Sequence, residues 1–257
     1  MSDSTAWPAA LPALVREVQA QEGVRAVFLS GSHARGEANR FSDVDVQVLV
    51  ASDGQVRNET QYRGGVLFSV ERSTVSHRER ALGDAETALW NLTALRTGRP
   101  LHDPEGVFAA LQARALAFAW AEVEAQAKAR AAHLIADEVE EVHRVMGGLA
   151  SGDEGKVAYA CLGLTLELGT AALLGTGTLI PTENRYLSLA RDAWADAGWR
   201  EAYGDLAGLT GKDVRARGHA ALRAFGRAVA LTRWPDGQGT ELAHEAARRA
   251  GAFLDGG

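Results

Sequence analysis

The sequence predicts an α+β protein in which a small sheet domain precedes a helical domain. Residues 43–50 alternate strictly, with apolar side chains on one side and mostly polar ones on the other, as in a half-buried strand. Short β-rich runs at 24–29 and 66–71 lie on either side of this strand in the sequence. From about residue 105 onward, apolar side chains recur with the three- and four-residue spacing of helices.

The composition is that of a globular protein without nucleic-acid-binding character. The 257 residues are 46% hydrophobic and 23% charged, which suffices for a sizeable core. The net charge of -6 and the scattered arginines argue against binding to a nucleic acid backbone. The most apolar stretch, 162–180, contains Glu167 and four glycines. We therefore expect a core helix there, no membrane partner and a cytoplasmic location.

The expected N-terminal domain covers residues 1–104. Its first helix is amphipathic and ends before Gly23, and a turn at 63–65 precedes its third strand. A loop at 98–104 contains two prolines, and we place the domain boundary there. In chain order we expect a helix, a strand, a turn or short helix, the alternating strand, a third strand and a second helix, at 11–21, 24–29, 30–42, 43–50, 66–71 and 77–97.

The expected C-terminal domain covers residues 105–257 and is helical to its end. One long helix is predicted over 105–146, because Gly147 and Gly148 follow its last apolar residue. A second helix is expected over 156–174. Further helices follow, with boundaries at Pro181, Gly211 and 235–239.

Two aspartates on the alternating strand carry the main chemical signal. Asp43 and Asp45 are two residues apart, so both project from one face, roughly 7 Å apart at the backbone. Two hard oxygen ligands at that separation can share magnesium ions bound to a nucleoside triphosphate. Such a metal neutralises phosphate charge and lowers the pKa of an attacking hydroxyl.

A Gly-Ser pair precedes these aspartates. Gly31 follows a strand, where a glycine lets backbone N–H groups approach phosphate oxygens closely. Ser32 and Ser42 can add hydroxyl donors to the same phosphates. Asp-x-Asp alone is often only a solvated strand face, and Gly-Ser alone is an ordinary turn. The combination of strand, Gly-Ser, short helix and Asp-x-Asp strand is far more specific.

A second acidic group lies on the predicted long helix. Glu138 falls inside the apolar stripe of that helix, and Glu141 falls at its edge, four residues after Asp137. A carboxylate at a buried margin can act as a general base if burial raises its pKa. The alternative is a charged helix face that pairs with Arg130 or Arg144, and the pattern alone does not decide between them.

Residues 28–36 and 42–45 resemble the signature of DNA polymerase β-type nucleotidyltransferases. The resemblance implies a small mixed sheet with both aspartates on one strand. It also implies that Asp43 and Asp45 bind magnesium, while Gly31 and Ser32 hold ATP or another nucleoside triphosphate.

The family usually has a third carboxylate on a neighbouring strand. Glu71 is the one acidic residue on the relevant face of the strand at 66–71, whereas the gapless comparison places the family's carboxylate at Leu67. Two alternatives follow. Either the strand register is shifted relative to the family and Glu71 is a metal ligand, or the site works with two carboxylates. The remaining interpretation makes Glu71 a solvated strand end.

Residues 134–142 are similar to the helix that opens the C-terminal domain of kanamycin-type aminoglycoside nucleotidyltransferases. The resemblance implies that Asp137 contacts the acceptor, that Glu141 is the general base, and that the enzyme is a homodimer. We assign Glu138 to acceptor binding as well. Val145 stands where the family has a phosphate-contacting lysine.

Three basic residues are candidates to replace that lysine, namely Arg144, Lys156 and Arg185. Arg185 opens a helix behind Pro181 and is assigned to the nucleotide, although the pattern itself favours a surface arginine at a helix start. The function expected from the whole sequence is transfer of a nucleoside monophosphate to a small hydroxyl-bearing acceptor, best an aminoglycoside. The alternatives are a protein-modifying transferase of antitoxin type and a non-catalytic nucleotide-binding module.

Overall fold

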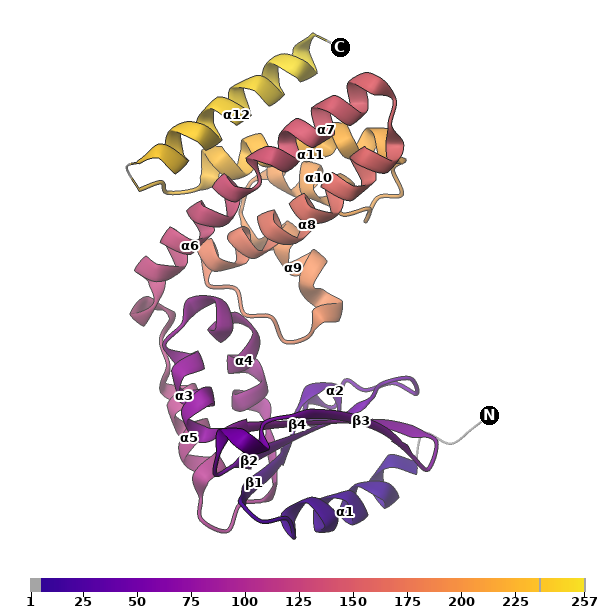
Figure 1. The fold of residues 1–257 in the computed structure, drawn as a ribbon, viewed down its shortest axis with the longest axis vertical. Helices are drawn as coiled ribbons and strands as arrows, with labels where there is room; N and C mark the ends of the chain where they lie inside the picture. The colour runs from indigo at the N-terminus through magenta and orange to yellow at the C-terminus, as the bar shows by residue number, and fades with distance from the viewer. Residues whose placement is uncertain (1–5, 236, 257) are drawn as a thin grey trace. The chain divides into compact units, whose positions relative to one another are not determined.

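The computed structural model describes residues 6–235 and 237–256 and divides the chain into two compact units, Met1–Glu122 and Val123–Gly257 (Figure 1). This division lies after the one predicted at residue 104. The reason is that the segment following residue 104 still packs on the sheet, where the Phe108 ring stacks on Phe28 with centroids 4.1 Å apart.

The N-terminal unit is built on a five-stranded sheet in the order β3-β4-β2-β1-β5. β2 and β4 are parallel, and the other neighbouring pairs are antiparallel, so the sheet is mixed as expected. The strands are β1 (Val24–Leu29), β2 (Val44–Val50), β3 (Asn58–Arg63), β4 (Val66–Thr74) and β5 (Arg99–His102). The helical segments are α1 (Ala6–Gln19), α2 (Gly31–Arg35), η1 (Asp53–Gln55), α3 (Val75–Leu82), α4 (Ala85–Thr97), α5 (Val107–Ala117) and η2 (Trp120–Glu122).

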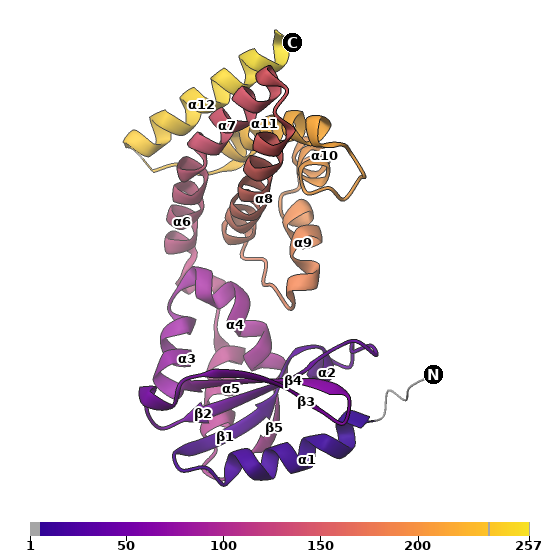
Figure 2. The ribbon, with the colours of Figure 1, turned by 45° about the vertical axis from the view of Figure 1, so that its right-hand side comes forward.

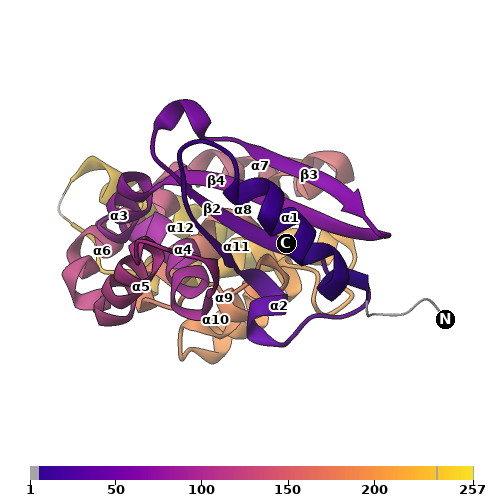
Figure 3. The ribbon, with the colours of Figure 1, turned by 90° about the horizontal axis from the view of Figure 1, so that it is seen from below.

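The alternation of apolar and polar side chains along β2 determines which face of the sheet is packed in the valine core. Val44, Val46 and Val48 are fully buried in one core with Leu14 of α1. Figure 2 shows α1 along that side of the sheet and α3 and α4 on the other side. Seen from below, α1 lies in front of the strands (Figure 3). Asp45 therefore faces away from the valine core, on the side that carries the α3–α5 layer.

Three expectations for this unit were wrong. The loop predicted at 98–104 contains β5, and Pro100 is tolerated there because β5 is an edge strand. β3 was not expected, because its residues are mostly polar and it lies at the other edge of the sheet. The helix predicted at 77–97 is divided into α3 and α4, since Asp84 accepts a hydrogen bond from Thr87 N at 2.8 Å and starts a new helix.

The C-terminal unit is helical, with α8 at its centre. Its buried side chains include Leu164, Leu168, Trp199, Tyr203 and Phe225. By length and composition α8 could cross a membrane, but 61% of its most apolar stretch is buried, as in a core helix. The helical segments are α6 (Glu124–Asp137), α7 (Val139–Ser151), α8 (Glu154–Thr176), η3 (Glu183–Arg185), α9 (Tyr186–Ala193), α10 (Ala197–Leu206), α11 (Val214–Leu231) and α12 (Gln238–Asp255).

The single helix predicted at 105–146 was wrong, because this stretch forms α5, α6 and most of α7. One break lies at Glu138, between α6 and α7. Gly148 does not end α7. A Cβ atom there would lie 2.7 Å from Val157 Cγ2, so the missing side chain allows α7 to pass close to α8. The helix ends at Gly152, which has a φ of 73°.

Candidate active site

Asp43 and Asp45 lie at the start of β2. Asp45 pairs with Ser69 in the parallel β2–β4 ladder, and Asp43 comes one residue before the strand. Both are half-buried. Among residues 6–235 and 237–256, neither carboxylate takes part in an ion pair or accepts a side-chain hydrogen bond. Two anionic groups are thus held close together with their oxygens free.

Gly31 makes the position of Asp45 attainable. A Cβ atom at residue 31 would lie 1.8 Å from Asp45 Oδ2, far inside van der Waals contact. The φ of Gly31 is +67°, in the left-handed region that favours glycine. The backbone N–H of Ser30 donates to the Asp45 carbonyl oxygen at 2.9 Å, which fastens the start of α2 to β2. The two halves of the motif are therefore in direct contact.

The electrostatics of this pair favour a cation. The pKa of Asp45 is raised to about 6, chiefly by burial and then by the charge of Asp43, while Arg35 opposes the shift. A divalent cation between the two carboxylates would stabilise their ionised forms and so lower this pKa. Among the described residues no cluster of three or more His, Cys, Asp or Glu side chains is placed to hold a metal. The two aspartates fit a metal that completes its coordination with phosphate oxygens and water.

Glu71 lies two pairs further along the ladder than Ser69, opposite Gln47. Its Oε1 accepts a hydrogen bond from Arg78 Nη2 at 2.9 Å, and its Oε2 accepts one from Gln47 Nε2 at 3.0 Å. Arg78 is buried and also donates to Ser73 Oγ at 2.8 Å. Both oxygens of Glu71 are therefore engaged within the sheet and α3.

The other predicted nucleotide contacts lie beside the aspartates. Ser32 is half-buried in α2, and its carbonyl oxygen accepts from Glu37 N at 2.9 Å. Ser42 Oγ accepts from Asn39 N at 2.9 Å, which orders the loop before Asp43.

Sequence reasoning missed two neighbours of this site. The charge of Arg35 acts on Asp45, and its side chain is only 9% exposed. Phe41 is 82% exposed, although it is a large apolar side chain. The signals in the sequence were an arginine inside the Gly-Ser motif and an aromatic residue directly before Ser42.

The helical unit brings Glu138 and Glu141 together beside Gly163 of α8. A Cβ atom at Gly163 would lie 3.5 Å from Glu138 Oε2 and 3.6 Å from Glu141 Cγ, so both side chains lie against this point of α8. Glu141 forms an ion pair with Arg144 through its Oε1. The Oε2 atoms of Glu138 and Glu141 are buried and have no hydrogen-bond partner among the described residues.

The pKa of Glu138 is raised to about 7, mainly by burial. The carboxylates of Glu167 on α8, Glu141 and Asp137 contribute to this rise. The guanidinium of Arg144 opposes it. Glu167 was not predicted, because it lies 29 residues after Glu138 in the sequence.

Two predicted residues lie on the surface of this unit. Asp137 is exposed and forms a pair with His133 of α6 at 3.2 Å. Arg185 is exposed at the end of η3.

Replacing Gly31 by alanine tests the contact with Asp45. Gly36 is a matched control, because its φ of +75° is similar but no atom lies within 4 Å of an added Cβ. We expect Gly36→Ala to lower the free energy of unfolding by about 1 kcal/mol, from backbone strain alone. Gly31→Ala should cost about 1–3 kcal/mol more, because it also displaces Asp45. Urea denaturation measures both, and equal costs would show that the contact is absent.

The raised pKa of Glu138 predicts a pH-dependent stability. The folded state binds this proton more tightly than the unfolded chain, so its contribution is full below about pH 4.5 and is lost as the pH rises through about 7. Relative to Glu138→Gln, the wild type should therefore lose roughly 2–3 kcal/mol of unfolding free energy between pH 5 and pH 8. Exposed Glu140, changed to Gln, is the control. Parallel pH profiles of wild type and Glu138→Gln would contradict this assignment.

Part of the N-terminal unit matches a known protein family. Residues 11–79 match the family model of the nucleotidyltransferase domain. A solved structure of a nucleotidyltransferase-like protein from Exiguobacterium sibiricum is similar to the chain with a TM-score of 0.47 and 14% identity. That similarity covers 96% of this chain and 89% of the other. None of the curated proteins matches the sequence.

The matched range contains β1, α2, β2 and β4, and with them Gly31, Asp43 and Asp45. The predicted α+β architecture is confirmed, with a five-stranded mixed sheet followed by a helical unit. The N-terminal unit is thus similar, over residues 11–79, to the nucleotidyltransferase domain.

Proposed function

We propose that this protein is a magnesium-dependent nucleotidyltransferase that moves a nucleoside monophosphate, best AMP from ATP, to a hydroxyl of a small acceptor. The observation that carries the proposal is the pair of unengaged aspartates on β2, with Gly31 against Asp45. This arrangement lies inside the range that matches the nucleotidyltransferase domain.

Asp43 and Asp45 would hold magnesium together with the triphosphate. The metal supplies charge neutralisation at the phosphates and activation of the attacking hydroxyl. Gly31 lies directly beside Asp45, and the backbone N–H groups of Gly31 and Ser32 would bind the phosphates. We propose a site with two protein carboxylates, because Glu71 is already bound by Arg78 and Gln47.

The carboxylates of the helical unit would serve the acceptor. Glu141 accepts the proton of the acceptor hydroxyl as that oxygen attacks the α-phosphorus, and pyrophosphate leaves. Glu138 and Asp137 bind amino groups of the acceptor. An ammonium group beside Glu138 would offset the like charges that raise its pKa. A polyamine such as an aminoglycoside is therefore the acceptor class that this charge pattern supports best.

The remaining features of the proposal rest on the family resemblance. The protein would act in the cytoplasm as a homodimer, and Arg185 would contact the triphosphate. Its exposed position at the end of η3 is compatible with that role.

A non-catalytic nucleotide-binding module is the second candidate. Ser69, which has no charge, stands opposite Asp45 in the neighbouring strand. If catalysis needs a third carboxylate at that place, the domain binds nucleotide without transferring it. A protein-modifying transferase of antitoxin type receives less support, because such chains usually lack a helical unit of this length.

Pyrophosphate release tests the proposal. The wild type is mixed with magnesium, each of the four nucleoside triphosphates and a panel of aminoglycosides. We expect release that requires both ATP and an aminoglycoside. Asp45→Asn should lower the rate by at least about 100-fold, because it removes a metal ligand. Asp53→Asn, at an exposed aspartate of the same unit, should leave the rate unchanged.

Each failure of this assay has a distinct meaning. Full activity of Asp45→Asn would refute the assigned site. Nucleotide binding without release across the panel would favour the non-catalytic module.

A further inference from the structure

A cavity of about 220 Å³ in the helical unit is separate from both groups of carboxylates. It lies between α6, α8 and the end of α11, and Trp194 closes one side. Its volume is below the range of about 300 Å³ or more that is usual for drug-sized ligands, so it suits a small molecule.

The polar side chains that line the cavity are donors. Lys128 and Arg233 supply two positive charges. Thr232 Oγ1 is buried and has no hydrogen-bond partner among the described residues. The indole N–H of Trp194 likewise finds no acceptor in the described part of the chain. No carboxylate is among the residues that line this cavity.

One carboxylate stands near the cations. Glu124 forms an ion pair with Lys128 at 2.6 Å. Lys128, and to a lesser degree Arg233, lower the pKa of Glu124, so both cations lie near it. Among the described residues at the cavity, one negative charge therefore faces two positive charges, and these side chains carry a net positive charge.

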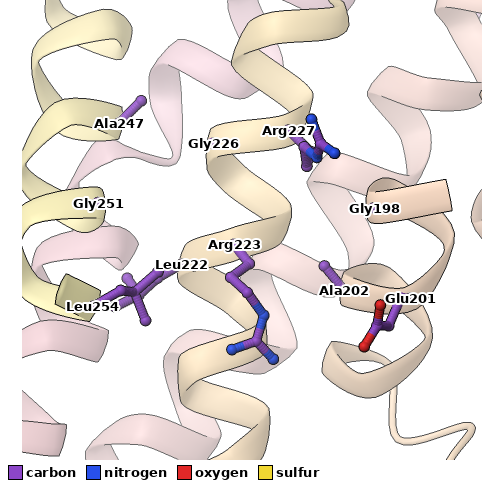
Figure 4. Close-up of a pocket in the computed structure, with 10 residues that line it drawn as sticks. All are labelled: Gly198, Glu201, Ala202, Leu222, Arg223, Gly226, Arg227, Ala247, Gly251 and Leu254. Carbon is purple, nitrogen blue, oxygen red and sulfur yellow. The ribbon is translucent and has the colours of Figure 1, made fainter. Parts of the chain in front are cut away.

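A larger groove nearby in the same unit differs in this respect. Its volume is about 410 Å³, and it is lined by α10, α11 and α12 (Figure 4). Arg223 and Arg227 line it together with Glu201, and the two arginines face Asp205 and Asp196 at 4.0 Å and 3.5 Å. Two positive charges there face three negative ones, so that groove shows no preference for an anion.

We propose that the smaller cavity binds a small organic anion with a carboxylate or phosphate head and a flat or apolar body. Lys128 and Arg233 hold the head, and the unsatisfied indole N–H of Trp194 binds one of its oxygens. Ala131 and Leu231 contact the body. The site is independent of the proposed transferase activity.

Binding of three probes to the full chain tests this site. The probes are benzoate, inorganic phosphate and benzamide, a neutral molecule of the shape of benzoate. We expect at least one of the two anions to bind at least 10-fold more tightly than benzamide in isothermal titration. In the ¹⁵N-labelled protein, the indole N–H signal of Trp194, assigned with Trp194→Phe, should shift on binding. Binding of phosphate alone identifies a phosphate head, and binding of benzoate alone identifies a carboxylate.

Two charge changes at the cavity should act in opposite directions. Arg233→Gln should weaken anion binding at least 5-fold, and Glu124→Gln should tighten it about 3-fold, because it removes a competing carboxylate. Arg248→Gln, at an exposed arginine of α12, is the control and should change nothing. No binding of either anion at about 10 mM, or equal affinity in wild type and Arg233→Gln, would overturn the proposal.

Discussion

The N-terminal site depends on the close approach of Gly31 to Asp45. The bond from Ser30 N to the Asp45 carbonyl oxygen fixes the start of α2 against β2. With that bond in place, the space that a side chain of residue 31 would fill is occupied by the Asp45 carboxylate. The glycine of the motif thus makes room for the carboxylate of the aspartate. This explains in physical terms why the glycine and the aspartates occur together.

Unbalanced negative charge is the second organising constraint. Most buried charges in this chain are satisfied within the fold: Arg78 binds Glu71, and Arg72 binds Glu59 at 3.0 Å. The carboxylates of Asp45 and Glu138 are not balanced in this way, and burial and like charges raise the pKa of each. Ionised carboxylates in such surroundings are costly unless a cation offsets them. A metal ion and an acceptor amine are the cations that the proposed reaction supplies.

The sequence allowed the central parts of the fold to be predicted, because they follow from short-range patterns. The strict alternation around Val46 predicted β2 and the face on which Asp45 lies. β3 and β5 escaped prediction because edge strands do not need an apolar face and tolerate Pro100. The break at Glu138 also escaped, because nothing in the helical spacing marks it.

The candidate site could be predicted in its residues but not in its partners. Asp43, Asp45 and Gly31 were recognisable from the motif, whereas the bond between Arg78 and Glu71 depends on how α3 packs on β4. The influence of Glu167 on Glu138 depends likewise on the packing of α8 beside α7. Contacts between residues far apart in sequence are set by tertiary packing, which no local pattern encodes.

The most direct test of the central claim is a titration with Mn²⁺, as a stand-in for magnesium, in the presence of a non-hydrolysable ATP analogue, followed by electron paramagnetic resonance. The account predicts binding to the wild type and to Glu71→Gln, and binding at least about 10-fold weaker to the double variant Asp43→Asn/Asp45→Asn. Unchanged Mn²⁺ binding in the double variant, or its loss in Glu71→Gln alone, would contradict the assignment of the two aspartates as the metal-binding pair.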